Sequence, residues 1–443
     1  MSNAERIQPC KDDPRYWQYK GGKVLLLGGS KEDNLFQIPD LEEHLDLLQS
    51  CGGNYIRCTM SSRDEGDVWP FEKDPDTGKY DLSKPGQEYW RRFEKLLDLC
   101  EERNIILQIE LWDRFDFARA PWQENAFNPK NNINYTETES GLKENIETHP
   151  GQCENAFFRT LPEMENNTLV LPIQQAYVDH LLCLSLERPN VLYCMNNETS
   201  EPHAWGIYWI NWIQNRAKEK DALVFVTDMF DDGFKGEDSE TYPYIFDHPE
   251  IYTFGDISQI NSRNFREIHW LKAEYMVREF RRHVRPVNMV KIYGGGHAFH
   301  GSGFNKDGVE RMIRALMNGV AAARFHRPTS GNGLNERAQN CIRALRLVEE
   351  QVKFWDLSPR MDLLVDRLEE VYACASKDGA IMLYFPHGAS IDVNFAGYPG
   401  ARRLQWFSVE QENADREEKL EGGQKVKITA PSVSDWIAVI RSY

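Results

Sequence analysis

The sequence predicts a (β/α)8 barrel followed by a small antiparallel β-sandwich. The first observation is that eight short β-rich runs alternate with helical patterns between Lys23 and about Pro328, which is the strand count of this barrel. The second is that several of these runs are almost continuously hydrophobic, as parallel strands buried on both faces are. The third is that no GxGxxG pattern follows the first run, which disfavours a doubly wound open sheet.

The barrel strands are expected where the hydrophobic runs lie. These are residues 23–29, 54–60, 105–111, 191–197, 223–229, 251–257, 287–293 and 321–327. Helices are expected between the runs because apolar residues recur there at spacings of three and four. The helical segments are 41–51, 88–104, 173–188, 205–220 and 266–283, and a further helix over 336–355 closes the barrel.

The pattern changes after Leu357-Ser358-Pro359 to short β runs separated by turns, which predicts a sandwich. The runs are 371–379, 380–388, 390–397, 403–409, 425–431 and 435–443, and the charged stretch 411–421 is expected to be a solvated loop. We therefore divide the chain into an N-terminal extension (1–22), the barrel (23–357) and the sandwich (358–443). Within the barrel, residues 112–170 form a long insertion without clear period, a type of loop that often binds ligands.

Composition limits the classes of partner. The net charge is -17, which disfavours nucleic acid and anionic lipid, and no apolar run reaches the roughly 18 residues of a membrane span. Aromatic residues reach 12%, which suits stacking on sugars but is equally explained by a large barrel core. The nine cysteines are odd in number and lack CxxC spacing, so buried free thiols are expected. The oligomeric state is left open.

Candidate functional residues are those that follow the strand ends, because barrel active sites lie there. They are Arg57, Glu110, Trp112, Asp113, Asn197, Glu198, His203, Trp205, Asp228, Asp256, Lys291, Tyr293, His297, His300 and His326. Carboxylates, amides and tryptophans together fit cleavage of a glycosidic bond. That reaction uses one protonated acid and a second carboxylate as nucleophile or base. Trp112, His203, Trp205, His297 and His300 are expected to line the sugar site, with the insertion as one wall.

Several motifs resemble those of known glycoside hydrolases. The run VLYCMNNE (191–198) resembles the acid/base signature on the fourth strand of the clan A glycoside hydrolases, and NYIR (54–57) resembles their second strand. Residues 311–328 and 354–364 resemble bacterial glycoside hydrolases related to apiosidases. The C-terminal runs resemble a small β module often labelled a collagen-binding domain, a label that is not evidence of collagen binding.

The resemblance implies roles for three residues. Glu198 would be the general acid/base and the proton donor, Asn197 would contact a sugar hydroxyl, and Arg57 would support the nucleophile. It also implies a plant or algal glycan, or an oligosaccharide from one, as substrate, and a bacterial periplasmic or cell-surface location with the signal peptide removed. The free thiols leave a cytoplasmic location open.

The sequence departs from the family pattern at the seventh strand. The family places a nucleophilic glutamate where Lys291 stands, and no Glu or Asp occurs between Val284 and Asn305. We expect another carboxylate to serve instead, with Asp256 and Asp228 as first candidates and Glu110 and Asp113 as further ones. A substrate that supplies its own nucleophile and a barrel that binds sugar without cleaving it are alternatives. A further alternative is a lyase in which Lys291, Tyr293, His297 or His300 removes a proton beside a uronate carboxylate.

No metal and no cofactor is expected. His297 and His300 lack a nearby glutamate at metalloprotease spacing, and they follow three glycines. The carboxylates of Asp228, Asp231 and Asp232 lack the spacing of an EF-hand.

Overall fold

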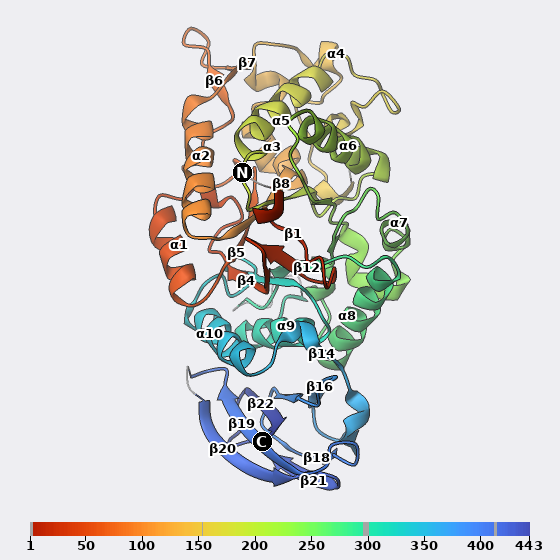
Figure 1. The fold of residues 1–443 in the computed structure, drawn as a ribbon. Coiled ribbons are helices and arrows are strands. Elements are labelled where there is room, and N and C mark those ends of the chain that lie inside the picture. The colour runs from red at the N-terminus through yellow and green to blue at the C-terminus, as the bar shows by residue number, and fades with distance from the viewer. Residues whose placement is uncertain (1–2, 153, 296–300, 412–413) are drawn as a thin grey trace.

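The computed structural model describes residues 3–152, 154–295, 301–411 and 414–443, and its central element is an eight-stranded parallel sheet (Figure 1). The strand order is β10-β9-β8-β5-β4-β13-β12-β11. The bounds are β4 Leu26–Gly29, β5 Tyr55–Thr59, β8 Ile106–Asp113, β9 Val191–Asn197, β10 Val226–Thr227, β11 Gly255–Asp256, β12 Val287–Ile292 and β13 Ala322–Phe325. Seven of them lie within the predicted runs, and β8 extends two residues beyond the run 105–111. Thr253 bridges the two end strands, since its amide donates to the Val226 carbonyl at 2.9 Å. The predicted (β/α)8 barrel is confirmed.

Ten α-helices occur among the described residues, and the longer ones surround the sheet (Figure 1). They are α1 Leu41–Ser50, α2 Gln87–Glu102, α3 Arg119–Glu124, α4 Glu137–Ser140, α5 Leu171–Ser185, α6 His203–Glu219, α7 Tyr242–Asp247, α8 Arg266–Phe280, α9 Asn305–Met317 and α10 Glu336–Gln351. In α2, Tyr89, Phe93, Leu96 and Cys100 are buried at spacings of three and four, which is the stripe that packs on the barrel. None of the helices in the described ranges is both long and apolar enough to cross a membrane.

The N-terminal extension forms a small antiparallel sheet that the sequence patterns did not predict. Its strands are β1 Gln8–Pro9, β2 Trp17–Tyr19 and β3 Gly22–Val24. Trp17 is fully buried and its indole nitrogen donates to Asn288 Oδ1 at 2.9 Å. Because Asn288 lies near the start of β12, Trp17 closes the amino-terminal end of the barrel.

The insertion between β8 and α5 is ordered by its aromatic and amide side chains. Phe117 stacks on Phe157 with ring centroids 4.1 Å apart, and both rings are buried. The Asn128 and Asn132 side-chain amides donate to backbone carbonyls, which satisfies polar groups that no strand or helix pairs. A hairpin of β6 (Phe71–Lys73) and β7 (Tyr80–Pro85) lies in the preceding connection.

Residues after α10 form two antiparallel sheets at one end of the barrel, as predicted (Figure 1). One has the order β14-β16-β17-β22-β19-β20 and the other β15-β18-β21. The bounds are β14 Leu357–Pro359, β15 Leu364–Val365, β16 Tyr372–Ser376, β17 Ile381–Phe385, β18 Ser390–Asn394, β19 Ala401–Ser408, β20 Ala414–Glu421, β21 Lys425–Thr429 and β22 Trp436–Ser442.

The prediction that residues 411–421 form a solvated loop is corrected, because most of this charged stretch is strand β20. β20 is an edge strand that pairs with β19 among the described strands. An edge strand can carry many charged side chains, so its sequence need not alternate between hydrophobic and polar residues. The cross-strand ion pair between Arg403 and Glu417, at 2.7 Å, uses the charges that suggested a loop.

The sandwich packs against α8 and α9 of the barrel. Tyr372 of β16 stacks on Trp270 with ring centroids 4.9 Å apart. The buried Arg314 pairs with Glu310 at 3.2 Å and with Glu370 at 3.1 Å. All eight cysteines in the described ranges are free, and Cys183 alone among them is exposed.

Candidate functional site

A cavity of about 350 Å³ opens at the carboxyl-terminal end of the barrel strands. Its walls come from residues at or just after four of the strands and from the loops that follow. Five candidates predicted from the sequence line it, namely Asn197, Glu198, Lys291, Tyr293 and His326. Lys291, which stands where the family pattern places a nucleophilic glutamate, therefore lines the same cavity as Glu198.

Glu198 is the centre of this cavity and is held by three donors. Lys291 Nζ lies 2.5 Å from Glu198 Oε1, and the Tyr293 hydroxyl donates to the same oxygen at 2.9 Å. Arg114 lies 3.6 Å from the other carboxylate oxygen. Burial alone would raise the pKa of Glu198, but the charges of Lys291 and Arg114 outweigh it and hold the pKa below its usual range. The carboxylate is therefore ionised at neutral pH.

The backbone of Glu198 has φ of 56°, in the left-handed region that few residues other than glycine adopt. Such a conformation costs on the order of 1 kcal/mol and persists where the surroundings enforce it, often at functional sites. Here the turn after β9 directs the carboxylate toward Lys291 and Tyr293 of β12.

Tyr293 stays protonated beside this anion. Burial and the charge of Glu198 both raise its pKa well above the usual phenol value. Its ring meets His326 edge-on, with centroids 5.0 Å apart, and burial lowers the pKa of that histidine, which favours the neutral imidazole. The cavity thus contains one carboxylate that is ionised and a neighbouring hydroxyl that can donate a proton.

A buried ion network supports the wall beneath the cavity. Arg57 is fully buried and lies 2.5 Å from Asp33 and 2.6 Å from Glu110. Arg327 also pairs with Asp33, at 3.0 Å. Burial raises the pKa of Glu110 to about 7 even though Arg57 opposes the shift. Arg57 therefore neutralises Asp33 and Glu110, and it does not contact Glu198.

The structure does not bring Asp228 or Asp256 to the cavity. Asp228 is 1% exposed and accepts hydrogen bonds from the Asn196 amide at 3.1 Å and the Met229 amide at 2.9 Å. Asp256 has no exposed surface and accepts from Ser258 and from Gln108 Nε2 at 3.1 Å. Burial raises the pKa of both carboxyls, that of Asp228 to about 7. Neither residue lines the cavity that contains Glu198, so the structure does not support either as the second catalytic group.

The tryptophans predicted to stack on sugar lie in the core instead. Trp112 is 2% exposed and Trp205 is fully buried, and their centroids are 6.1 Å apart within a cluster that includes Trp209. The Trp205 indole nitrogen donates to Asn196 Oδ1 at 3.0 Å. A buried ring offers no face to a ligand, so neither tryptophan is part of the candidate site. Their sequence spacing does not reveal that both rings pack into the core.

The other predicted residues have separate positions. His203 lines a neighbouring cavity of about 540 Å³ and stacks on Tyr244, with centroids 4.3 Å apart. Asp113 is buried and pairs with Arg63. His297 and His300 lie outside the described residues.

Asn197 carries an unused acceptor into the cavity. It is 2% exposed, and its Oδ1 atom is buried without a hydrogen-bond partner among the described residues. A buried acceptor without a partner costs about 1 to 3 kcal/mol, so it is suited to receive a hydroxyl from a ligand.

The cavity lining also contains charged loop residues that were not in the final candidate set. Asp33, Arg63, Arg114, Arg263 and Arg327 all line the cavity. Arg114 directly follows β8. Its position identifies it as a candidate site residue once the end of that strand is known. Arg63 and Arg263 lie further from the strand ends, and only the folded loops bring them in. Across the described ranges, no three His, Cys, Asp or Glu side chains are grouped to hold a metal ion.

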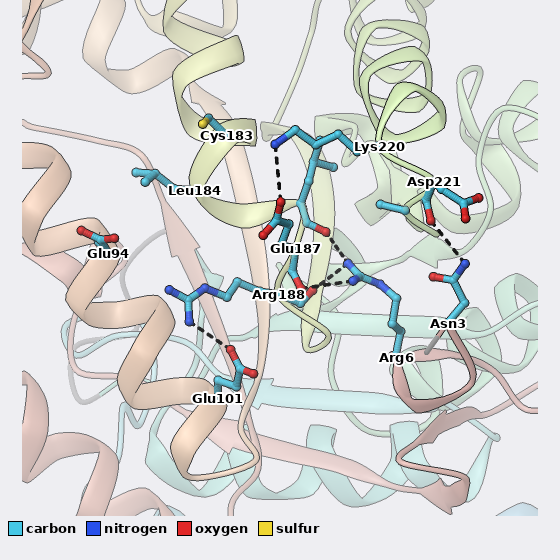
Figure 2. A pocket seen from close by; sticks show the side chains of 12 residues that line it. Asn3, Arg6, Glu94, Glu101, Cys183, Leu184, Glu187, Arg188, Lys220 and Asp221 are labelled. Atoms are coloured by element: carbon cyan, nitrogen blue, oxygen red, sulfur yellow. Dashed lines mark hydrogen bonds and ion pairs between the residues drawn. The ribbon is translucent and has the colours of Figure 1, made fainter. Parts of the chain in front are cut away.

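A larger cavity of about 610 Å³ lies near the ends of α2, α5 and α6, and it contains none of the candidate residues (Figure 2). Its charged groups bond to the protein itself. Arg6 donates to the carbonyls of Leu186 at 2.6 Å and Arg188 at 2.7 Å, and Arg188 pairs with Glu101 at 3.0 Å. This cavity lies between the N-terminal segment and the barrel. The hydrogen bonds of Arg6 attach that segment to the residues after α5.

Comparison with known proteins agrees with this fold. A family described as a domain of unknown function, DUF6298, matches residues 69–230. No curated protein matches. A glycoside hydrolase family 5 structure from Bacteroides vulgatus ATCC 8482 is similar with a TM-score of 0.64 and 12% identity, over 98% of this chain and 92% of that one. Another structure, described as a glycoside hydrolase, has a TM-score of 0.63 and 12% identity, over 98% of this chain and 96% of that one. The chain has a glycoside hydrolase family 5-like (β/α)8 fold.

Proposed function

We propose that the protein cleaves a glycosidic bond in the cavity at Glu198. The observation that carries this proposal is the ionised Glu198 carboxylate at the carboxyl-terminal end of β9, which lies beside the protonated Tyr293. The unpartnered Asn197 acceptor next to it suits a sugar hydroxyl. The likeness to glycoside hydrolase structures makes a carbohydrate the expected ligand.

We give Glu198 the role of base rather than that of proton donor, a choice supported by the Lys291 and Arg114 charges beside its carboxylate. Its ionised carboxylate accepts a proton from water, the water oxygen attacks the anomeric carbon and the glycosidic C–O bond breaks. The leaving oxygen takes a proton from a second water molecule on the opposite face of the sugar ring, because Tyr293 and Lys291 both bond to Glu198 Oε1 and therefore lie on the side of the attacking water. In this scheme no glutamate is needed on β12, because Lys291 keeps Glu198 ionised.

Eliminative cleavage is a second candidate, which the Lys291 and Tyr293 pair favours. In a uronate-containing glycan, a base removes the proton beside the carboxylate and the leaving oxygen departs with a proton, which leaves an unsaturated sugar. The two candidates differ in product, since elimination creates an ultraviolet-absorbing double bond and hydrolysis adds water. A barrel that binds sugar without cleaving it releases neither product.

The test is a panel of plant and algal glycans and aryl glycosides, assayed for reducing ends and for unsaturated products. We expect Glu198→Gln to lower the rate at least about a hundredfold, the scale of losing a general base. The matched control is Glu267→Gln, which changes an exposed glutamate on α8. Full activity in Glu198→Gln would contradict the proposal, and ligand binding without any product would leave only a binding role.

A further inference from the structure

The carboxylates that line the Glu198 cavity are all neutralised by cations. Asp33 pairs with Arg57 and Arg327, Glu198 with Lys291, and Asp231 with Arg114 at 2.9 Å. The lining contains five cationic side chains, Arg63, Arg114, Arg263, Lys291 and Arg327, against these three carboxylates. Carboxylates behind the lining also pair with two of these cations, since Arg63 bonds to Asp113 and Asp116 and Arg327 bonds to Glu32.

Arg263 is the cation of this lining that has no carboxylate partner within the described ranges. It follows the short helix over Ser258–Asn261 and is exposed at the cavity. Its guanidinium carbon lies 5.1 Å from the centroid of the Phe234 ring. This cation–π contact orients the guanidinium and does not use its N–H groups as hydrogen-bond donors. Arg263 thus offers a positive charge and several hydrogen-bond donors that pair with no carboxylate in the part of the chain that the structure describes.

Ser302 provides a second unused polar group at the same place. It is 2% exposed and lines the cavity, and its Oγ atom is buried without a hydrogen-bond partner among the residues described. It is close to Arg263 along the backbone, because the Arg263 amide donates to the carbonyl of Gly301 at 3.1 Å. The two residues therefore lie on loops joined by a backbone hydrogen bond, and both line the same cavity.

Arg311 of α9 fixes these two loops to each other. Its guanidinium donates to the Asn264 carbonyl at 2.9 Å, next to Arg263, and also to the Ser302 carbonyl. A third bond, at 3.0 Å, reaches the carbonyl of Tyr293. Arg311 has no exposed surface, so this connection is part of the rigid wall and the Arg263 and Ser302 pair is built into it.

We propose that Arg263 and Ser302 form a subsite for an anionic group of the substrate, either a carboxylate or a sulfate ester on a sugar. This inference rests on the proposed function, since it names the class of carbohydrate that the Glu198 cavity takes. An oxyanion satisfies the Arg263 charge and the Ser302 hydroxyl at once, whereas a neutral sugar leaves the charge unpaired. The remaining lining offers hydroxyl and amide donors from Ser262 and Gln259.

The test is calorimetric binding at fixed ionic strength, independent of turnover. The probes are oligosaccharides of equal length in three forms: uronates of galactose, glucose and mannose, sulfated galactans, and the neutral counterparts. We expect an anionic form to bind at least about tenfold more tightly than its neutral counterpart, the scale of a charge-assisted hydrogen bond. Preference for the uronates or for the sulfated sugars identifies which anion the subsite takes.

Two variants and a control locate the effect. Arg263→Gln is expected to weaken binding of the anionic ligand about tenfold, and Ser302→Ala about threefold, with neutral ligands unchanged. The control Arg278→Gln removes the same charge from an exposed position on α8. Thermal unfolding of each variant separates loss of the fold from loss of the subsite.

Equal binding of anionic and neutral forms, no binding of any probe, or equal effects of Arg263→Gln and Arg278→Gln would overturn the inference. The proposed cleavage fails in a different way: anionic ligands bind through Arg263 but no product appears. The two conclusions can therefore be rejected separately.

Discussion

Two groups of carboxylates at the same end of the barrel have opposite environments. Glu198 opens to a cavity and is surrounded by Lys291, Arg114 and the Tyr293 hydroxyl, so its pKa lies below the usual value. Asp228 and Asp256 are closed off from solvent and accept hydrogen bonds from amides and a hydroxyl, so burial raises their pKa. A strand-end position is therefore not sufficient for a catalytic role. Access to a cavity and the neighbouring charges separate the functional group from the structural ones.

The largest expected effect comes from the buried ion network beneath the cavity. In Arg57→Met, Asp33 and Glu110 lose the cation that lies 2.5 Å and 2.6 Å away. Because Glu110 then has no ion-pair partner among the described residues, while Asp33 keeps Arg327, we expect the free energy of unfolding to fall by about 3 to 5 kcal/mol. Urea denaturation measures this loss, with exposed Arg91→Met as the control that changes it by less than about 0.5 kcal/mol. A loss of under about 1 kcal/mol for Arg57→Met would show that the network is not needed.

Removal of the cation beside Glu198 gives the next effect. Lys291→Met is expected to lower kcat/KM about a hundredfold, since Lys291 keeps Glu198 ionised. Without the lysine the pKa of Glu198 rises, so the acidic limb of the pH–rate profile moves to higher pH. Lys84→Met, at an exposed position on β7, is the matched control. A lower rate with an unmoved acidic limb would contradict this assignment of Lys291.

Asp228 is expected to affect stability rather than activity, because its pKa is raised whereas that of Glu198 is lowered. Its pKa is about 7 in the folded protein and near 4 when unfolded, so the folded state binds more protons in between. Stability should therefore fall as pH rises from about 4 to about 7 and then level off. In Asp228→Asn this fall should be smaller by about 1 to 3 kcal/mol in unfolding experiments at the two pH values. Exposed Asp76→Asn should keep the full dependence, and an unchanged slope in Asp228→Asn would show that Asp228 ionises normally.

The fold followed from hydrophobic periodicity. Each barrel strand overlaps a predicted run, and only β8 extends beyond its run, because continuous hydrophobic stretches between helical patterns leave few other arrangements. The sheet of β1 to β3 and edge strand β20 were missed, because short or charged strands depend on a neighbour for their pairing and have no pattern of their own.

The candidate site was predictable only in part. Position at the carboxyl-terminal ends of β9 and β12 was sufficient to identify Asn197, Glu198, Lys291 and Tyr293, which line one cavity. Sequence does not reveal which side of a strand end faces the cavity, so Trp205 and Asp256 were included although both are buried. Arg263 was missed because its place depends on how the loop after β11 folds.

The smallest expected effect distinguishes Asp231 from Glu198. Asp231 also lines the cavity and pairs with Arg114, but its side chain is 42% exposed. Since Glu198 remains in place without it, Asp231→Asn should change kcat/KM by less than about fivefold, the scale of an exposed ion pair. A hundredfold loss in a steady-state assay would identify Asp231 as the second catalytic carboxylate and would contradict the present roles.

The central claim, that Lys291 and Arg114 keep Glu198 ionised, is tested most directly by carbon-13 NMR titration of the glutamate carboxyls. The Glu198 signal is assigned by its absence in Glu198→Gln. The structure predicts that this carboxyl remains ionised down to below about pH 4, the ordinary glutamate range. A midpoint near neutral pH would contradict the claim, because Glu198 would then be protonated and placed to act as the proton donor.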